Sequence, residues 1–331
     1  MVKLPRRNFL LLAAGAAAVS TISRIAWGQT YPTKPVTLIV PFSAGGSPDV
    51  VARILSPRLS ELLGQQVIVE NVGGAAGMNG VSRVAKAAPD GYQLVLGSLG
   101  TIAINQTLFK NPPYNSATDL TPVILVADIP LMLIARKDLP ATNLQEFIAY
   151  VKLNSAKMQY GSVGVGSINH LSCALLTSSF GGNVVHVPYR GGAQIIQDLI
   201  SGRIDFQCPL TPVAIPQIEG NQVKAIAMLT RNRSLIFPNL ATAHEQGVAN
   251  FEAVTWFAFF LPKGAPESIV QKLRIATNAT MNTPAVEEHL KEIGVDLVAG
   301  ERRSPDYLRQ LVVSETEKWA KVIKSAGIKP E

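Results

Sequence analysis

Short, apolar, β-branched runs alternate with helical patterns along most of this chain, and glycine-rich turns separate them. The first unit begins with the run Val36–Val40, passes through a turn containing Gly45 and Gly46, and continues as a helical pattern over residues 50–63. The run Gln66–Glu70 again leads through a glycine-rich turn into a helical pattern. Such alternation indicates an α/β fold in which helices cover both faces of a mostly parallel sheet.

The alternation is interrupted once and then resumes, which predicts two lobes. The apolar stretch Val123–Ala135 has the pattern of two strands broken near Asp128, and a new series of strands and helices follows it. A chain of this length can bury two cores. We predict a signal peptide at residues 1–28, a first lobe at 29–128, a second lobe at 129–252, and, at 253–331, a return strand with C-terminal helices that complete the first lobe.

The N-terminal residues have the order of an export signal. Arg6 and Arg7 precede the apolar run Phe9–Val19, and small residues follow it. This run is 11 residues long, whereas a membrane-spanning helix needs about 20, so the segment is a signal and not an anchor. The paired arginines followed by Asn-Phe-Leu resemble a twin-arginine signal. We expect cleavage near Gly28 and Gln29, and export to the periplasm.

The charge of the chain does not indicate a nucleic-acid-binding protein. The 30 basic and 23 acidic residues give a net charge of +7, and the predicted signal peptide removes four basic residues and no acidic one, which leaves +3. A weak positive charge spread along the chain is not the footprint of nucleic-acid binding, although it is compatible with small anionic ligands. No later stretch is long and apolar enough to predict a membrane span.

The cysteines and histidines do not have the spacing of a metal site. Cys173 and Cys208 are far apart in the sequence, and the four histidines form no pair at ligand spacing. The oxidising periplasm permits a disulfide between the two cysteines. Two buried free thiols are the alternative, and the sequence leaves both open.

Three glycine-rich loops follow predicted strands and lead into helices, which is where open α/β sheets bind ligands. The N–H groups at such a turn can hold a carboxylate or phosphate without an arginine or lysine. Taken alone, the first loop is better interpreted as an ordinary strand–helix turn with a cap. The candidate residues of this loop are Phe42, Ser43, Ala44, Gly45, Gly46 and Asp49.

The second loop, residues 161–170, adds hydroxyl groups to the same arrangement. Ser162 and Ser167 can donate to a ligand oxygen, and Ser167 can equally serve as a helix N-cap. His170 lies one helical turn further on. The glycine spacing differs from the GxGxxG order of dinucleotide sites, and no GxSxG motif surrounds Ser167. We expect neither a cofactor nor catalysis at this loop.

The third loop brings an aromatic residue and a cation to the start of another helix. Tyr189 offers both a ring face and a hydroxyl group, and it precedes Arg190 and a glycine pair. We expect the long side chain of Arg190 to point to solvent.

These loops carry a resemblance to a known family. The segments concerned are Val40–Arg53, Val69–Asn71, Pro89–Tyr92, Gly161–Leu171, His186–Gly191 and Asp198–Leu199. In them, and almost end to end after Gln29, the chain resembles the tripartite tricarboxylate transporter receptors, also called Bug solute-binding proteins. The resemblance implies a two-lobe periplasmic binding protein-like fold of type II, and a ligand carboxylate held between the lobes by main-chain amides and waters.

The resemblance also implies a binding site shared by the two lobes. Its residues are Phe42, Ser43, Ala44, Gly45, Gly46, Asp49, Ser162, Gly164, Gly166, Ser167, His170, Tyr189 and Asp205. Pro48 departs from the family pattern, which usually has Thr or a similar residue there, and Arg190 stands where Lys is common. The implied partners are a small organic acid and the integral membrane subunits of a tripartite tricarboxylate-type transporter. We expect a monomer with no cofactor and no nucleic-acid partner.

Two other functions stay open from the sequence. An exported hydrolase would use Ser167, His170 and Asp205 as a triad, although no oxyanion hole is recognisable around them. A ligand sensor that docks on a signalling protein would have the same sequence features as a transport receptor.

Overall fold

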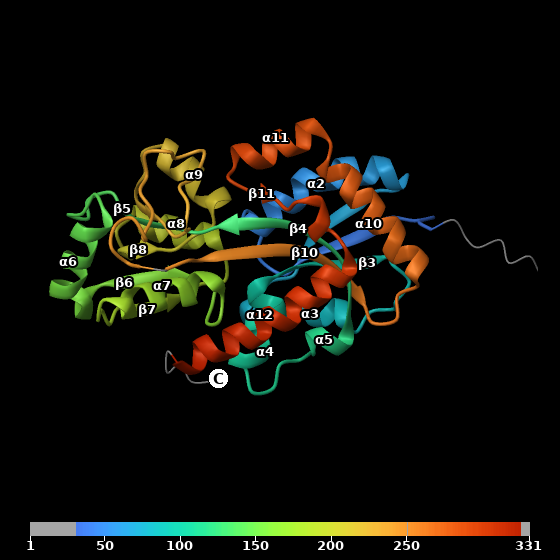
Figure 1. Cartoon of the computed structure of the whole chain (residues 1–331), viewed down its shortest axis with the longest axis horizontal. Helices are drawn as coiled ribbons and strands as arrows, with labels where there is room; N and C mark the ends of the chain where they lie inside the picture. Colours follow the sequence, from blue (N-terminus) through green and yellow to red (C-terminus); the bar gives the residue numbers. More distant parts are fainter. Residues whose placement is uncertain (1–30, 250, 326–331) are drawn as a thin grey trace, which may run out of the picture. The chain divides into compact units, whose positions relative to one another are not determined.

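Two β-sheets, one of six strands and one of five, organise the part of the chain that the computed structural model describes (Figure 1). The described residues are 31–249 and 251–325. By its internal contacts the chain divides between Thr33 and Lys34, and both sheets lie after this division. The predicted signal peptide lies outside the described residues.

The six-stranded sheet has the order β11-β4-β10-β3-β1-β2 and defines the first lobe. Its strands are β1 (Val36–Val40), β2 (Val67–Asn71), β3 (Gln93–Ser98), β4 (Leu120–Pro130), β10 (Val254–Pro262) and β11 (Asp296–Leu297). Its α-helices are α2 (Ser47–Leu63), α3 (Met78–Ala85), α4 (Asn105–Leu108), α5 (Ser116–Asp119), α10 (Glu267–Met281), α11 (Pro284–Glu292) and α12 (Pro305–Ser325). Two short 3-10 helices, η2 (Ala75–Gly77) and η5 (Gly300–Arg302), and a π-helix, η3 (Gly100–Ile104), belong to the same lobe. β10 lies inside this sheet and is buried after its first residue, which accounts for its nearly continuous apolar sequence.

The five-stranded sheet has the order β7-β6-β8-β5-β9 and defines the second lobe. Its strands are β5 (Met132–Arg136), β6 (Gln159–Ser162), β7 (Val185–Pro188), β8 (Phe206–Gln207) and β9 (Val223–Met228). Its helices are α6 (Leu144–Asn154), α7 (Ile168–Ser179), α8 (Gly192–Ile200) and α9 (Thr211–Glu219), with the turn η4 (Ser155–Lys157). Part of its core consists of Met132 and Ile134 from β5 packed with Ile195 and Leu199 from α8.

The predicted two-lobe α/β fold is confirmed, but each sheet is mixed and not mostly parallel. β1 pairs in parallel with β2 and β3, and β6 does so with β7 and β8. β10 is antiparallel to β3 and β4, and β5 is antiparallel to β8 and β9. The reason is that the chain crosses from β4 into β5 at Leu131 and later returns as β10 in the opposite direction. The exact limits of the lobes at 128/129 and 252/253 stay a prediction.

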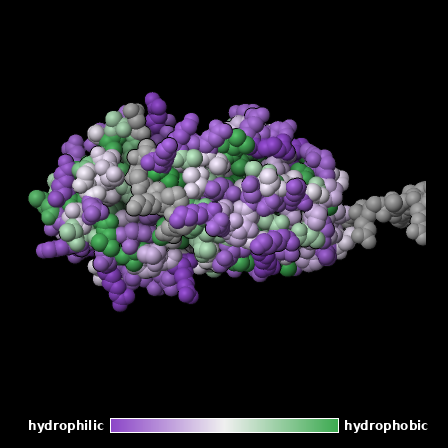
Figure 2. Space-filling model, turned by 90° about the horizontal axis from the view of Figure 1, so that it is seen from below, coloured by the Kyte–Doolittle hydropathy of each residue, from purple (hydrophilic) through white to green (hydrophobic). Residues whose placement is uncertain are grey.

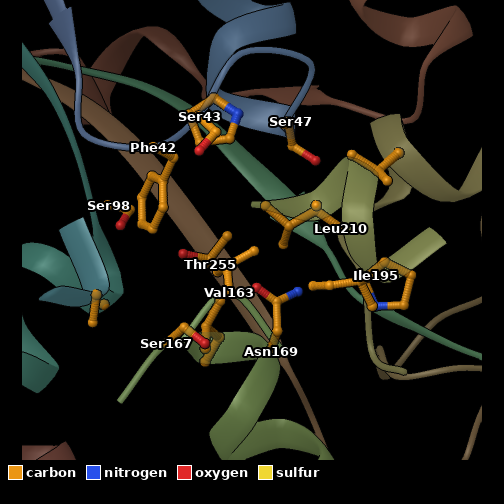
Figure 3. A pocket seen from close by; sticks show the side chains of 18 of the residues that line it. Phe42, Ser43, Ser47, Ser98, Val163, Ser167, Asn169, Ile195, Leu210 and Thr255 are labelled. Atoms are coloured by element: carbon orange, nitrogen blue, oxygen red, sulfur yellow. The ribbon is translucent and has the colours of Figure 1, made fainter. Parts of the chain in front are cut away.

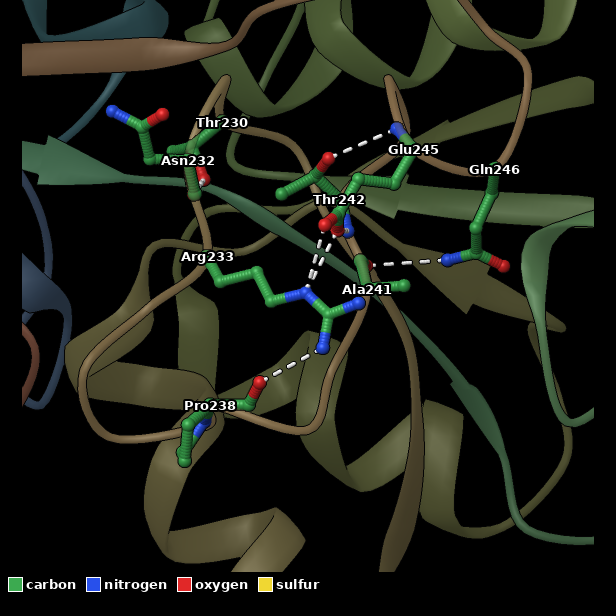
Figure 4. A network of polar contacts seen from close by, with 8 residues as sticks. All are labelled: Thr230, Asn232, Arg233, Pro238, Ala241, Thr242, Glu245 and Gln246. Atoms are coloured by element: carbon green, nitrogen blue, oxygen red, sulfur yellow. Dashed lines mark hydrogen bonds and ion pairs between the residues drawn. The ribbon is translucent and has the colours of Figure 1, made fainter.

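The connection from β9 to β10 is irregular, and a polar network fixes it (Figure 4). Arg233 donates from Nε to both carboxylate oxygens of Glu245 at 2.9 Å, and from Nη1 to the carbonyl of Pro238 at 3.0 Å. Glu245 also accepts a hydrogen bond of 2.8 Å from the N–H of Thr242. The segment that leads back to the first lobe is therefore held by side-chain contacts in place of regular structure.

Hydrophobic residues on the face seen in Figure 2 lie in small groups among hydrophilic ones. The most exposed large apolar side chains belong to different elements, with Leu153 in α6, Leu235 in the connection after β9 and Ile275 in α10. Among the described residues, no helix combines the length and the apolar character that crossing a bilayer requires.

Candidate ligand-binding site

A cavity lies between the two lobes, and residues of both line it (Figure 3). The space between its atoms amounts to about 690 Å³, its open mouth included. The described residues that line the cavity include serine, threonine, asparagine and glutamine side chains together with apolar ones, but no Asp, Glu, Lys, Arg or His.

Four helices begin at this cavity. The lining includes Ser47 from α2, Ile168 from α7, Gly192 from α8, and Leu210, the N-cap of α9. The first N–H groups of a helix have no partner within the helix, and that end carries a partial positive charge. Ser167 caps α7, whereas α2, α8 and α9 begin without a side-chain cap. The cavity thus combines main-chain donors with the positive ends of helix dipoles, which favours an anion.

The first loop is shaped by Asp49, which is buried in α2. Gly45 has φ +78°, a conformation that favours glycine, and its N–H donates to Asp49 Oδ2 at 2.9 Å. Arg53 Nε and Asn71 Nδ2 donate to Asp49 Oδ1 at 2.9 and 3.0 Å. Burial alone would raise the pKa of Asp49, but the hydrogen bonds from Arg53, Gly45 and Asn71 outweigh it and lower that pKa. Asp49 therefore supports the loop and does not line the cavity.

The second loop is braced by hydrogen bonds among its own residues and by a contact with His186. Ser167 Oγ accepts from the N–H of His170 at 3.3 Å and donates to the carbonyl of Gly164 at 2.7 Å. Ser162 Oγ lies 2.6 Å from His186 Nε2, and the rings of His170 and His186 are 4.1 Å apart between centroids. Burial lowers the pKa of His170 to about 4; burial and the neighbouring His170 lower the pKa of His186 to about 3. Both rings are therefore neutral at pH 7.

The side chains of Tyr189, in the third loop, and of Asp205, which precedes β8, contact other parts of the second lobe. The Tyr189 hydroxyl donates to Asp198 Oδ2 at 2.7 Å, and burial followed by this bond raises the pKa of Tyr189 to about 12. Asp205 accepts from Arg136 Nε at 3.0 Å and from the N–H of Gln159 at 2.8 Å. Neither Tyr189 nor Asp205 lines the cavity.

The structure brings only part of the predicted site to the cavity. The predicted residues in its lining are Phe42, Ser43, Gly46 and Ser167. The predicted residues outside its lining are Ala44, Gly45, Asp49, Ser162, Gly164, Gly166, His170, Tyr189 and Asp205. Several of the latter fix the loops that present main-chain groups to the cavity. Ligand binding by any of them stays a prediction.

Other polar residues of the lining were not selected from the sequence. They are Ser47, Ser98, Asn169, Gln207 and Thr255. Ser98 and Gln207 end β3 and β8, so their position at the carboxyl ends of strands is a signal that the sequence offered. Thr255 offered no such signal, because it reaches the cavity only through the return of the chain in β10.

The two lobes contact each other around the cavity. Ser43 Oγ donates to the carbonyl of Arg190 at 3.0 Å, and Thr211 Oγ1 donates to the carbonyl of Gly294 at 2.6 Å. A Cβ atom at Gly191 would lie 2.8 Å from Ser43 Cβ. Glycine at 191 therefore permits the close approach of the lobes at this point.

A disulfide joins two of the segments that form the cavity wall in the second lobe. Cys173 of α7 and Cys208, which follows β8, are bonded with their Cα atoms 5.7 Å apart. Asn169 Nδ2 donates to the carbonyl of Cys208 at 2.8 Å, between the same two segments. Of the two states that the sequence left open, the structure has the disulfide.

The side chains of the hydrolase alternative do not form a triad. Asp205 is bonded to Arg136 and to the main chain of Gln159, and Ser167 is a helix cap. His186, which contacts Ser162, is a poor base for that serine, because a histidine with a pKa of about 3 does not accept a serine proton at neutral pH. Among the described residues, no group of three His, Cys, Asp or Glu side chains is placed to hold a metal ion.

Comparison with known proteins agrees with this geometry. The model of the tripartite tricarboxylate transporter family receptors matches residues 51–328. The periplasmic binding protein BugD is 36% identical, with a TM-score of 0.88 over 91% of this chain and all of BugD. MatC from Rhodopseudomonas palustris, with bound malate, is 35% identical, with a TM-score of 0.85 over 88% of this chain and all of MatC. A second R. palustris protein, with adipate, is 35% identical, with a TM-score of 0.87 over 91% of this chain and all of that protein. The chain belongs to the tripartite tricarboxylate transporter receptor family of solute-binding proteins, as its loop motifs predicted.

Proposed function

We propose that the protein is a periplasmic receptor that captures a small organic carboxylate between its lobes and delivers it to the integral membrane subunits of a tripartite tricarboxylate-type transporter. One observation carries the proposal: four helix N-termini meet at one interlobe cavity whose described lining has no charged side chain. An anion is the ligand that the N–H groups and the positive dipole ends at such helix starts stabilise.

The receptor would capture the ligand by closing its two lobes around it. A ligand that contacts both lobes stabilises the closed form by the contacts that it makes only there. The hydrogen bonds from Ser43 to the Arg190 carbonyl and from Thr211 to the Gly294 carbonyl are direct contacts between the lobes, and they add to those that the ligand makes. The membrane subunits then recognise the closed receptor and accept the ligand.

The structural neighbours support the ligand class. MatC is described with bound malate, and the second R. palustris protein with adipate, so two relatives at 35% identity hold organic acids. The Cys173–Cys208 disulfide supports export, since an oxidising compartment allows it to persist. Export by a twin-arginine signal cleaved near Gly28, and a monomeric mature protein, belong to the same proposal.

A thermal-shift measurement tests the ligand class. The mature protein, residues 29–331, is heated at pH 7 with malate, succinate, adipate and benzoate, each at millimolar concentration, and in parallel with the corresponding amides. A ligand that binds only the folded state raises the melting temperature, by an amount that grows with its concentration over Kd. We expect at least one acid to raise it while its amide does not. Stabilisation by an amide as large as by its acid would contradict an anion site.

Delivery requires a separate test. Cells that carry the candidate membrane subunits take up the radiolabelled acid with either the wild-type receptor or a receptor that lacks its signal peptide. We expect uptake only with the exported form. Cells without any receptor are the control, and uptake in them equal to that with the wild-type receptor would argue against a role in transport.

A further inference from the structure

Two buried polar residues of the cavity lining each have a side-chain atom without a hydrogen-bond partner among the described residues. They are Gln207, 3% exposed, whose Nε2 has none, and Thr255, fully buried, whose Oγ1 has none. Other buried polar atoms without a partner, such as Thr277 Oγ1, belong to residues outside the cavity lining. Gln207 and Thr255 are thus set apart by their position at the site.

Both side chains are on the cavity side of their strands. Side chains alternate across a strand, so Thr255 shares its face of β10 with Phe257, which also lines the cavity. Gln207 is the last residue of β8, and it also lines the cavity. Figure 3 shows Thr255 among the side chains that surround the cavity. The two come from different lobes, so a ligand that reaches both would bridge them.

A buried donor without a partner is costly, and a ligand atom removes that cost. The lining also includes the polar side chains of Ser98 and Asn169, but neither accepts a hydrogen bond from Gln207 Nε2 or Thr255 Oγ1. The donors of Gln207 and Thr255 are neutral groups on strands, and sheets have only small dipoles. The helix N-termini suit the ionised carboxylate, whereas the strand position suits an uncharged oxygen.

We infer that Gln207 and Thr255 determine specificity by binding an uncharged hydroxyl or carbonyl oxygen of the ligand. The ligand class is then a hydroxy or oxo carboxylic acid, preferred over the acid that lacks this oxygen. The inference rests on the proposed function, because it requires the carboxylate to occupy the same cavity.

The test compares acids that differ by one hydroxyl group. Calorimetry gives Kd for malate and succinate, lactate and propionate, and 4-hydroxybenzoate and benzoate, with the wild type and with Thr255→Val and Gln207→Leu. Thr277→Val is the matched control, because it removes a buried, unpartnered hydroxyl away from the cavity. We expect the wild type to prefer the hydroxy acid of at least one pair by about tenfold, the usual scale of one buried hydrogen bond. Each site variant loses the preference, and Thr277→Val keeps it.

Stability of the unliganded protein supplies a second measurement. Thr255→Val and Gln207→Leu each remove a buried atom without a partner, so we expect melting temperatures equal to or above that of the wild type. A drop of more than about 5 °C in both, a destabilisation of roughly the scale of a lost hydrogen-bond partner, would show a structural role and overturn the inference. So would equal affinities within every acid pair, or a preference that both variants retain. If none of the six acids binds, the proposed function fails and this inference with it.

Discussion

Replacing Gly191 by alanine should prevent the lobes from closing fully around a ligand. Gly191 has φ −168°, an extended conformation that alanine adopts without strain. The new Cβ would lie 2.8 Å from Ser43 Cβ in the other lobe, an atom that no side-chain rotation moves away. Restoring an ordinary contact of about 3.5–4.0 Å requires a local separation of roughly 1 Å. That movement also lengthens the 3.0 Å hydrogen bond from Ser43 to the Arg190 carbonyl.

The expected cost is that of an overpacked contact, about 1–3 kcal/mol, or roughly 5- to 150-fold in Kd. Calorimetry with the best acid of the thermal-shift panel measures it. In a Ser43→Gly background the methyl group has room, so the same substitution should cost much less. Gly300→Ala is the control, since a methyl group there meets no atom within 4 Å. A Kd for Gly191→Ala within twofold of the wild type would refute the reasoning.

Three further predictions concern the second lobe. The pKa values of His170 and His186 are lowered to about 4 and 3, so these histidines take up protons in the unfolded chain at a higher pH than in the folded one. The free energy of unfolding, measured with urea, should therefore fall as the pH drops from 6.5 to 5, by up to about 1.4 kcal/mol per pH unit for each histidine. A free energy that does not change over this range would be contrary evidence. Reducing the Cys173–Cys208 disulfide, which joins residues 35 positions apart, should lower the free energy of unfolding by about 3–4 kcal/mol. An unchanged urea midpoint, in protein whose two thiols mass spectrometry shows to be free, would contradict this. Arg190→Gln should leave Kd within about threefold, because Arg190 is exposed and contacts Ser43 through its carbonyl; a loss beyond 100-fold, about 2.7 kcal/mol, would identify a buried ion pair.

The fold could be predicted where local patterns decide it. The units β1–α2 and β6–α7 are visible in the sequence because a β-branched run, a glycine turn and a helical pattern follow one another within a few residues. The direction of β10 could not be predicted, since its apolar sequence fits any central strand. Its antiparallel pairing depends on where the chain returns from the second lobe.

The site could be predicted at its loops but not at the strand residue Thr255, which reaches the cavity from β10. Ser43 and Ser167 belong to loops that glycines mark in the sequence, and both line the cavity. Asp49 and Asp205 have the chemistry of binding residues, yet their carboxylates are occupied by Arg53 and Arg136. The spacing of Asp49 and Arg53, four residues apart on α2, is compatible with their pairing. Spacing does not reveal the pairing of Asp205, because its partners are distant in the sequence. The start of α9 was missed as well, because Pro212 and Pro216 obscure its helical pattern.

The central claim is that main-chain N–H groups at converging helix N-termini hold the anion without a side-chain cation. A crystal structure of the mature protein with a bound acid tests it most directly. We expect the carboxylate oxygens to accept hydrogen bonds of about 2.7–3.2 Å from N–H groups at the starts of α2 and α7, directly or through one water. A carboxylate paired with an arginine or lysine side chain, or bound outside the cavity between the lobes, would contradict the claim.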